Sequence, residues 1–288
     1  MELQNLSNEI NLAKRAAKKC GTLLIKNKSE FNLRLNSNSK DTKLKADIES
    51  EDLIKTIITE KSSFPILAEE SGKSNNDLGD TFWVIDPLDG TANYNRNIPI
   101  CCISIGLVKD MKPILGVIYD FNNDDMYVGD SYSKNSFLND EIITTSNISK
   151  KEDGILITGL PHDSDYSEEA LNRMIDDMQK WQKIRMMGSA AMAACYVASG
   201  KVEQYQENGI YLWDVVAGAA IVESSGGIAK IFNQKDNFQQ RKNDCADATS
   251  GVISYDDFFE KYKVGEFDDK REIYDDYYLL EDFCQFYK

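Results

Sequence analysis

The sequence predicts an α+β fold, and three observations support this prediction. Apolar residues near the start recur at three- and four-residue steps, which indicates helices that bury one face. Short apolar runs bounded by turn residues follow, as is typical of buried strands. Two later segments rich in small apolar residues indicate further buried helices. With 288 residues, 42% of them hydrophobic, the chain can form one large domain or two closely packed lobes.

The first half of the chain predicts two helices followed by a sheet. Helices are expected at residues 6–24 and 48–58, on either side of a polar stretch. Strands are expected at residues 64–68, 82–85, 100–108, 114–119 and 125–129, with residues 109–112 as a hairpin turn.

The second half predicts one strand, at residues 154–159, and three helices. The helices cover residues 167–181, 189–199 and 214–224, the last ended by Gly226 and Gly227. Residues 264–288 are rich in acidic and aromatic side chains. For this tail, a helix docked on the body is favoured over a partner-binding segment.

The formal charge of −15 argues against binding to a nucleic-acid polymer, because phosphate backbones are held by clustered Lys and Arg. It suits a protein that gathers divalent cations. Residues 1–19 lack the apolar stretch of a secretory signal, and no later run is long enough to span a bilayer. We therefore expect a cytoplasmic protein without a membrane partner. Six cysteines without a CxxC pair predict reduced thiols.

His162 is the only histidine, which excludes a multi-histidine zinc site. A Ser-His-Asp triad could use it, but its position after Pro161 in a predicted loop favours a surface residue. The chemistry is therefore expected to depend on carboxylates, hydroxyls and backbone groups.

Residues 82–91 predict an apolar strand that runs into an acidic turn and a helix start. Asp86 and Asp89 would lie together there, and two close carboxylates repel unless a cation such as Mg²⁺ lies between them. Gly90 would let backbone N–H groups approach a phosphate. Taken alone, Asp-x-x-Asp-Gly is more simply explained as a capped turn, so further acids are needed.

Two other segments supply such acids. Glu69 and Glu70 close the strand at residues 64–68, although a surface turn explains them equally well. Asp214 opens an apolar helix, where aspartate is a favoured N-cap. A capping residue can still present one oxygen to a metal.

Together these segments resemble the signatures of the inositol monophosphatase family. The resemblance rests on residues 67–71, 83–94 and 213–218, is extended by residues 188–191, 207–210 and 226–227, and covers roughly residues 5–260. It implies a layered α-β-α-β-α sandwich of the inositol monophosphatase and fructose bisphosphatase type. It also implies a lithium-sensitive, homodimeric phosphomonoesterase with two or three Mg²⁺ per active site.

The resemblance implies a role for each matching position. The expected metal ligands are Glu69, Asp86, the Leu88 carbonyl, Asp89 and Asp214. Thr91, oriented by Asp47, would position the attacking water and help to deprotonate it. The expected contacts to the substrate are Asp89, Asp214, Glu207, the N–H groups of Gly90 and Thr91, and the segment of Gly188, Ser189 and Ala190. One departure concerns Leu44 and Ala46, which replace hydroxyls near Asp47 and put lithium sensitivity in question.

The expected organisation has three parts. Residues 1–145 would form an α+β lobe with most of the metal ligands, and residues 146–263 an α/β lobe with Asp214 and the substrate rim. Residues 264–288 would form the acidic, aromatic tail.

Glu207 favours inositol monophosphate or a similar small polyol phosphate, because a carboxylate accepts hydrogen bonds from hydroxyls and repels a second phosphate. A 3′(2′),5′-bisphosphate nucleotidase or another sugar phosphatase is the alternative, with Lys43 and Lys45 reaching a second phosphate. A catalytically inactive binding protein is a third possibility, against which the intact set of acids argues.

Overall fold

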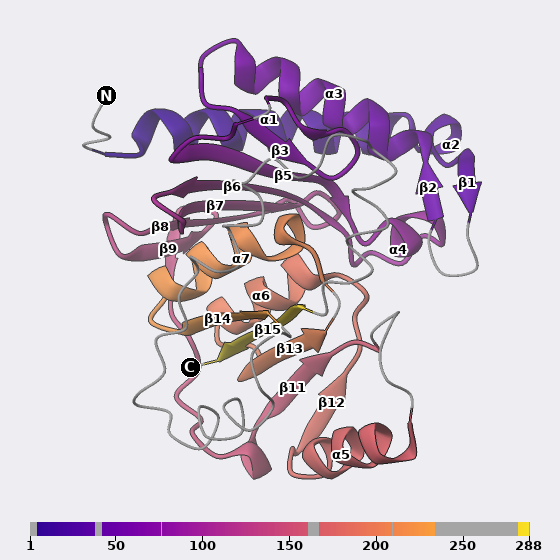
Figure 1. Cartoon of the computed structure of the whole chain (residues 1–288), viewed down its shortest axis with the longest axis vertical. Coiled ribbons are helices and arrows are strands. Elements are labelled where there is room, and N and C mark those ends of the chain that lie inside the picture. Colours follow the sequence, from indigo (N-terminus) through magenta and orange to yellow (C-terminus); the bar gives the residue numbers. More distant parts are fainter. Residues whose placement is uncertain are drawn as a thin grey trace.

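The computed structural model describes residues 5–37, 42–75, 77–160, 167–208, 210–233 and 282–287. Within these residues the chain forms five layers, which alternate helix, sheet, helix, sheet and helix from top to bottom in Figure 1. The predicted α+β class and the α-β-α-β-α sandwich are therefore confirmed.

Two long helices, α1 (Ser7–Lys26) and α3 (Lys45–Thr59), form the first layer and confirm both predicted helices. Small residues bring α1 close to the sheet. A Cβ atom added at Gly21 would lie 2.6 Å from the ring of Tyr119. The polar stretch between these helices contains the short elements α2 (Lys28–Phe31), β1 (Arg34–Ser37) and β2 (Thr42–Leu44).

An eight-stranded sheet lies beneath the first layer, in the order β10-β9-β8-β7-β6-β5-β3-β4. Only the β3–β5 pair is parallel among its strand pairs. The strands are β3 (Ile66–Ala68), β4 (Gly72–Lys73), β5 (Thr81–Asp89), β6 (Cys102–Lys109), β7 (Lys112–Asp120), β8 (Asp125–Asp130), β9 (Asn135–Leu138) and β10 (Glu141–Ile143). The sequence does not predict β4, β9 and β10, because such short strands show no clear alternation of apolar and polar residues.

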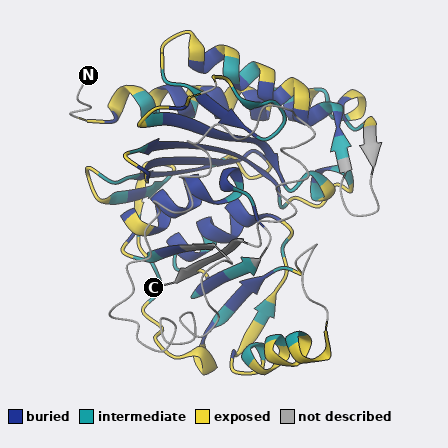
Figure 2. Cartoon of the chain, viewed as in Figure 1, coloured by how far each residue is buried: buried dark blue, intermediate teal, exposed yellow. Residues whose placement is uncertain are grey.

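The middle layer consists of α6 (Ala190–Ala198) and α7 (Leu212–Ser224), which are buried on nearly all sides (Figure 2). Helices that are apolar all round are expected between two sheets. A row of glycines in register on β6, β7 and β8 admits α7: Gly106, Gly116 and Gly129. A Cβ atom added at Gly116 would lie 2.0 Å from the carbonyl oxygen of Ala217. This close contact places the middle of α7 against the first sheet.

A five-stranded sheet, in the order β12-β11-β13-β15-β14, forms the fourth layer. Its strands are β11 (Ile155–Thr158), β12 (Lys183–Arg185), β13 (Gln204–Asn208), β14 (Ile228–Asn233) and β15 (Asp282–Tyr287). The outer helix α5 (Glu168–Met178) has no buried residue and closes the stack (Figures 1 and 2). Helix α5 confirms the helix predicted at residues 167–181.

The predicted helix in the tail is wrong for its last residues. Residues 282–287 form β15, which pairs antiparallel with both β13 and β14. Unpaired N–H and C=O groups on both neighbouring strands favour a strand at this position. The rest of the tail lies outside the described residues, and the division into three parts stays a prediction.

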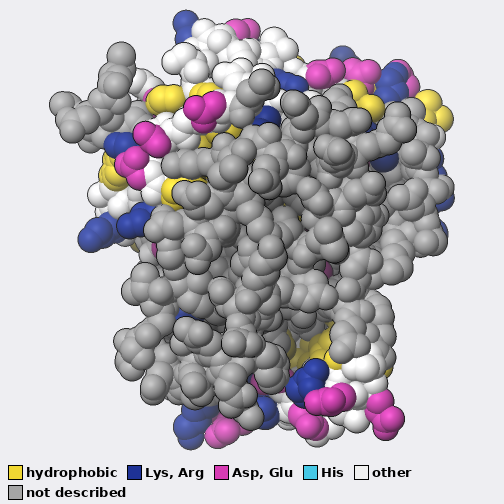
Figure 3. Space-filling model, viewed as in Figure 1, with side chains coloured by type: hydrophobic (Ala, Val, Ile, Leu, Met, Phe, Trp, Pro, Cys, Tyr) yellow, Lys and Arg dark blue, Asp and Glu magenta, His cyan; other side chains and the backbone are white. Residues whose placement is uncertain are grey.

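On the face shown in Figure 3, the described acidic and basic side chains lie interspersed, and no broad basic surface gathers among them. In the described part of the chain, no helix combines the length and apolar character needed to cross a membrane. Four of the cysteines, Cys20, Cys101, Cys102 and Cys195, are buried free thiols, as predicted. His162 lies outside the described residues.

Candidate active site

The two aspartates of the central motif lie on one strand and not in a turn after it. Strand β5 continues through Asp89, with an irregular register against β6 between Asp86 and Asp89. Pro87 falls in this irregular segment, where a missing N–H does not interrupt the ladder. The predicted acidic turn is therefore wrong, but the strand still brings both carboxylates to one end of the sheet.

Gly90 ends the strand in a conformation that requires glycine. Its φ is 88°, and a Cβ atom there would lie 2.8 Å from the carbonyl oxygen of Ile100. The backbone then turns directly into the short helix α4 (Thr91–Asn95). The N–H groups of Gly90 and Thr91 therefore follow immediately after the carboxylate of Asp89.

Glu69 reaches Asp86 because β3 and β5 are parallel neighbours. Ala68 is paired with Ile85, and the Glu69 N–H donates to the Ile85 carbonyl at 3.1 Å. The Glu69 and Asp86 side chains are hydrogen-bonded to each other, and burial raises the pKa of both. Two carboxyl groups in such contact require a shared proton or a cation.

Asp214 and Asp47 occupy equivalent positions in the first turns of two helices. The Asp214 Oδ2 accepts from the N–H of Tyr211 at 2.7 Å, and the Asp47 Oδ2 accepts from the N–H of Leu44 at 2.6 Å. Asp214 is thus the third residue of α7 and not its N-cap, which is Tyr211. Each capping bond fixes one carboxylate relative to its helix.

Thr91 is directly connected to Asp47. Its Oγ1 lies 3.0 Å from Asp47 Oδ1 and 3.0 Å from the Leu88 carbonyl oxygen. A hydroxyl has one proton to donate, so it can serve only one of these acceptors at a time. Burial raises the pKa of Asp47 to about 7, which suits a group that exchanges a proton near neutral pH.

Ser189 and its neighbours contact Asp89. The Ser189 hydroxyl donates to Asp89 Oδ2 at 2.5 Å, and the Ala191 N–H donates to the same oxygen at 2.8 Å. The Ala190 backbone also hydrogen-bonds to Asp89, and the Cys102 thiol lies 3.7 Å from it. The structure thus gives Ser189 and Ala190 a role in holding Asp89, which the sequence does not predict.

Asn93 is a further residue that the sequence leaves without a role. Its Nδ2 lies 2.7 Å from the Ile100 carbonyl oxygen, 2.8 Å from that of Met187 and 3.3 Å from that of Gly188. It therefore ties α4 to the residues that precede β6 and α6. Its position inside the motif, two residues after Thr91, is the signal that could have identified it.

Glu207 lies on β13 and faces the same group of acids. Burial is the largest cause that raises the pKa of Asp214, and the Glu207 carboxylate raises it further, as Asp89 does for the pKa of Glu207. Burial is the main cause of the Glu207 shift, to about 7. The second sheet thus contributes a carboxylate beside the residues from the first.

The structure therefore brings together acids from α3, β5, α7, β13 and the end of β3. Burial also raises the pKa of Asp89 and Asp214. The ionised form of these acids is therefore unfavourable without a cation to neutralise it. The donors are all oxygens, which fits a hard cation such as Mg²⁺. In the described ranges, no three His, Cys, Asp or Glu side chains already stand in the arrangement of a metal site.

Comparison with known proteins identifies a family for this chain. The family model described as "Inositol monophosphatase family" matches residues 5–255. A protein named Nus factor SuhB from Pasteurella multocida is 32% identical over 231 residues, which cover 78% of this chain and 85% of the relative. Inositol monophosphatase 1 from Solanum lycopersicum is 32% identical over 233 residues, 78% of this chain and 84% of the relative.

Solved structures show the same fold. The inositol monophosphatase from Anabaena superposes with a TM-score of 0.68 at 34% identity and covers 79% of this chain and 84% of its own. The extragenic suppressor protein SuhB from Bartonella henselae has a TM-score of 0.72 at 30% identity, with 78% and 87% covered. The five layers, the carboxylates at the end of β5 and the match along most of the sequence agree, so the chain belongs to the inositol monophosphatase family and is a phosphomonoesterase.

Proposed function

We propose that the protein hydrolyses a small polyol phosphate, of which inositol monophosphate is the best candidate, in a reaction that depends on Mg²⁺. The observation that carries this proposal is the meeting of Glu69, Asp86, Asp89 and Asp214 beside the Thr91–Asp47 hydrogen bond. The overall reaction adds water to the phosphate monoester and releases the alcohol and inorganic phosphate.

The metal ligands in this proposal are all oxygens. They are the carboxylates of Glu69, Asp86, Asp89 and Asp214 and the carbonyl of Leu88. Two or three Mg²⁺ ions would be held there. When bound, Mg²⁺ would neutralise charge on the phosphate and make water more acidic. The N–H groups of Gly90 and Thr91 would hold phosphate oxygens beside these ligands.

Thr91 and Asp47 would handle the proton of the attacking water. The water would donate a hydrogen bond to Thr91 Oγ1. The Thr91 hydroxyl would in turn donate its own proton to Asp47 Oδ1, which lies 3.0 Å from Thr91 Oγ1. Asp47 would receive that proton, since burial places its pKa at about 7. Ser189 and Ala190 would act by holding Asp89, and Gly188 would border the alcohol.

Three observations support a polyol over a nucleotide bisphosphate. The Glu207 carboxylate is near enough to Asp214 to raise its pKa, and a carboxylate there can accept hydrogen bonds from hydroxyls and repel a second phosphate. The Lys43 ammonium pairs with Glu70, and the Lys45 ammonium pairs with Glu30. Both lysines are thus engaged with carboxylates, which weakens the case for their binding a second phosphate. A bisphosphate nucleotidase or another sugar phosphatase is the second candidate.

A substrate panel tests the proposal. Phosphate release would be measured from inositol 1-phosphate, adenosine 3′,5′-bisphosphate, fructose 1,6-bisphosphate and p-nitrophenyl phosphate, with Mg²⁺ and with EDTA. We expect the highest kcat/KM for inositol 1-phosphate and its loss in EDTA. Turnover of none of the four with Mg²⁺ would overturn the proposal and favour a binding protein. Addition of Li⁺ would show whether Leu44 and Ala46, both fully buried, leave lithium inhibition intact.

We also propose that the protein works as a cytoplasmic homodimer. The four buried free thiols are compatible with a reducing compartment. Light scattering on the eluted protein measures its mass, and a value of one chain would contradict the dimer.

A further inference from the structure

We propose that Gly159 and Tyr205 together set the position of the Glu207 carboxylate, and that this position determines the preference of the site for polyol phosphates. The second half of this inference rests on the proposed function. The first half concerns geometry and can be tested without it.

The register of two parallel strands brings Gly159 beside Glu207. Strand β11 pairs with β13 so that Ile157 lies opposite Tyr205 and Thr158 opposite Gln206. One further residue along both strands places Gly159 opposite Glu207, and Figure 1 shows β11 and β13 side by side. Tyr205 and Glu207 lie two residues apart, so their side chains leave β13 on the same face.

That face points into the molecule. Tyr205 and Ile157 are each 1% exposed and belong to the core around the middle helices. The alternate residues point the other way, because the side chain of Gln206 contacts Asp177 on the outer helix α5 at 3.1 Å. The Glu207 side chain therefore starts from the buried side of the sheet, toward the acids on β5 and α7.

Gly159 leaves the space that the Glu207 carboxylate fills. A Cβ atom added at Gly159 would lie 2.1 Å from Glu207 Oε1, 2.2 Å from its Cδ and 2.4 Å from its Oε2. Any side chain at this position would overlap the whole carboxylate group. Because Glu207 has rotatable bonds, the carboxylate would have to move and the β11 backbone would not.

Tyr205 holds the carboxylate in that space. Its hydroxyl donates to Glu207 Oε2 at 3.1 Å, and the ring that carries the hydroxyl is buried. A buried ring has little freedom, so the hydroxyl is a fixed donor. Hydrogen bonds to a charged acceptor are stronger than those between neutral groups. The Oε2 atom of Glu207 is thereby directed to Tyr205. The other carboxylate oxygen, Oε1, would remain free to accept a hydrogen bond from a substrate hydroxyl.

Both residues are positioning residues, since neither is placed against substrate. Loss of a hydrogen bond to a charged group is expected to weaken the contact to a substrate hydroxyl about tenfold. A phosphate ester without hydroxyls does not use Glu207, so its turnover should not change. The predicted effect is thus on substrate preference and on KM, with kcat nearly unchanged.

The test compares Tyr205→Phe, Gly159→Ala and Glu207→Ala on inositol 1-phosphate and p-nitrophenyl phosphate. Tyr205→Phe removes one oxygen and leaves the ring, so it keeps the test valid if Gly159→Ala does not fold. Tyr132→Phe is the matched control, because Tyr132 is 42% exposed. We expect a KM for inositol 1-phosphate about tenfold higher in Tyr205→Phe, with p-nitrophenyl phosphate within twofold. In the Glu207→Ala background, Tyr205→Phe should have no further effect.

Crystal structures of Tyr205→Phe and Gly159→Ala give a readout that is independent of activity. The Glu207 carboxylate should occupy a different position in at least one of them. An unmoved carboxylate in both, or a tenfold loss on both substrates alike, would overturn the inference. If the wild type does not hydrolyse inositol 1-phosphate, the proposed function fails, and the crystal structures still decide whether Gly159 and Tyr205 position Glu207.

Discussion

The hydroxyl of Thr91 lies 3.0 Å from Asp47 Oδ1, and this hydrogen bond joins the short helix after β5 to the start of α3. Forty-four residues separate the two in sequence, yet Asp47 is also fixed by the N–H of Leu44. A carboxylate and a hydroxyl from distant parts of the sequence are therefore held in one hydrogen bond, with the carboxylate fixed on its other oxygen.

Asp47→Asn should lower kcat by about a hundredfold with little change in KM, because an amide still accepts the Leu44 N–H but takes no proton from Thr91. Steady-state kinetics with inositol 1-phosphate and Mg²⁺ measure the change. Asp52→Asn, an exposed aspartate on the same helix, is the control and should match the wild type. A kcat for Asp47→Asn within threefold of the wild type would remove Asp47 from the proton path.

The metal-free protein should lose stability as pH rises from about 5 to about 8. Burial raises the pKa of Asp47 to about 7 and also raises that of Asp86 and Asp214, so the folded state keeps protons that the unfolded state has released. The stability that these protonated carboxyl groups contribute is complete below their pKa in the unfolded chain. It is lost as the pH rises through their pKa in the folded protein. Mg²⁺ should reverse the trend, because it favours the ionised carboxylates.

Thermal unfolding in EDTA and in Mg²⁺ across this pH range tests the prediction. The Mg²⁺-induced rise in Tm should grow with pH. A metal-free Tm that increases between pH 5 and pH 8 would contradict the assigned cluster.

Ser189→Ala should weaken both helix α6 and the metal site. The Ser189 hydroxyl accepts from the Met192 N–H as an N-cap and donates to Asp89 at 2.5 Å. Loss of the cap is expected to cost about 1 kcal/mol. The Mg²⁺ concentration for half-maximal activity should also rise, because Asp89 loses one fixed donor. Ser167→Ala is the matched control, since Ser167 caps the outer helix α5. An equal shift in the Mg²⁺ requirement of both variants would contradict a role of Ser189 in metal binding through Asp89.

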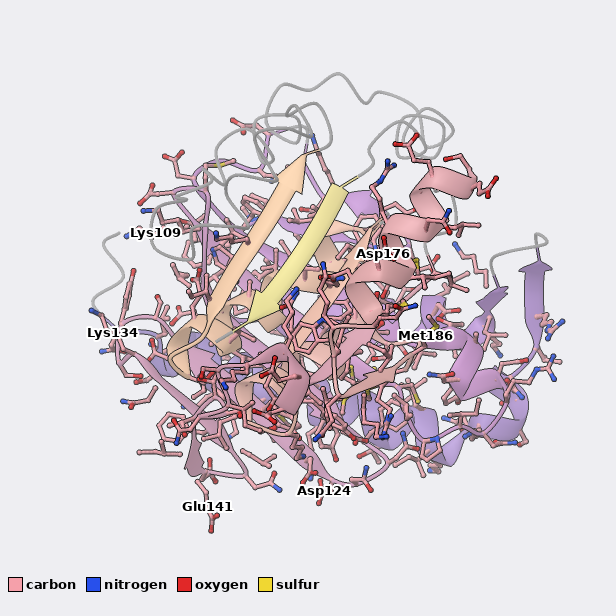
Figure 4. All side chains as sticks on the ribbon, turned by 90° about the horizontal axis from the view of Figure 1, so that it is seen from below. Lys109, Asp124, Lys134, Glu141, Asp176 and Met186 are labelled. Carbon is pink, nitrogen blue, oxygen red and sulfur yellow. The ribbon has the colours of Figure 1, made fainter. Side chains whose placement is uncertain are left out.

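Glu207→Ala should reduce kcat/KM for inositol 1-phosphate about tenfold or more and leave adenosine 3′,5′-bisphosphate unchanged or improved. The carboxylate accepts from substrate hydroxyls in the first case and repels a phosphate in the second. Glu141→Ala is the control, because Glu141 is exposed and its side chain lies at the edge of the molecule in Figure 4. The opposite change in preference would favour the nucleotidase.

Gly116→Ala should destabilise the fold by about 3 kcal/mol, because the new Cβ would meet the α7 backbone at 2.0 Å. Helix α7 supplies Asp214, so residual folded protein should also need more Mg²⁺. Gly226→Ala is the comparison, where no atom lies within 4 Å but φ is 92°. It should cost about 1 kcal/mol of backbone strain and leave the Mg²⁺ requirement alone. Chemical denaturation gives both free energies, and equal losses would argue against the close contact.

The sequence alone determined the long helices and the main strands of the first sheet, and it proposed which acids form the site. Periodicity is a local property, so helices α1, α3 and α7 are visible in it, and the glycine after Asp89 is visible as a motif. Short strands such as β9, β12 and β13 escaped prediction because they carry too few apolar residues to show a strand pattern. Strand β15 escaped because its partners lie far away in the chain, and the aromatic composition of the tail equally suits a helix face.

The tertiary structure decided which of these groups meet. The β3–β5 register brings Glu69 to Asp86, the glycine row admits α7 and so places Asp214, and the start of α6 turns Ser189 toward Asp89. The proposed preference for polyol phosphates would depend on the same kind of long-range relationship, since the space at Gly159 and the hydroxyl of Tyr205 reach Glu207 only because β11 lies beside β13. Strand register and helix docking are set by packing across the whole chain, which no local pattern records.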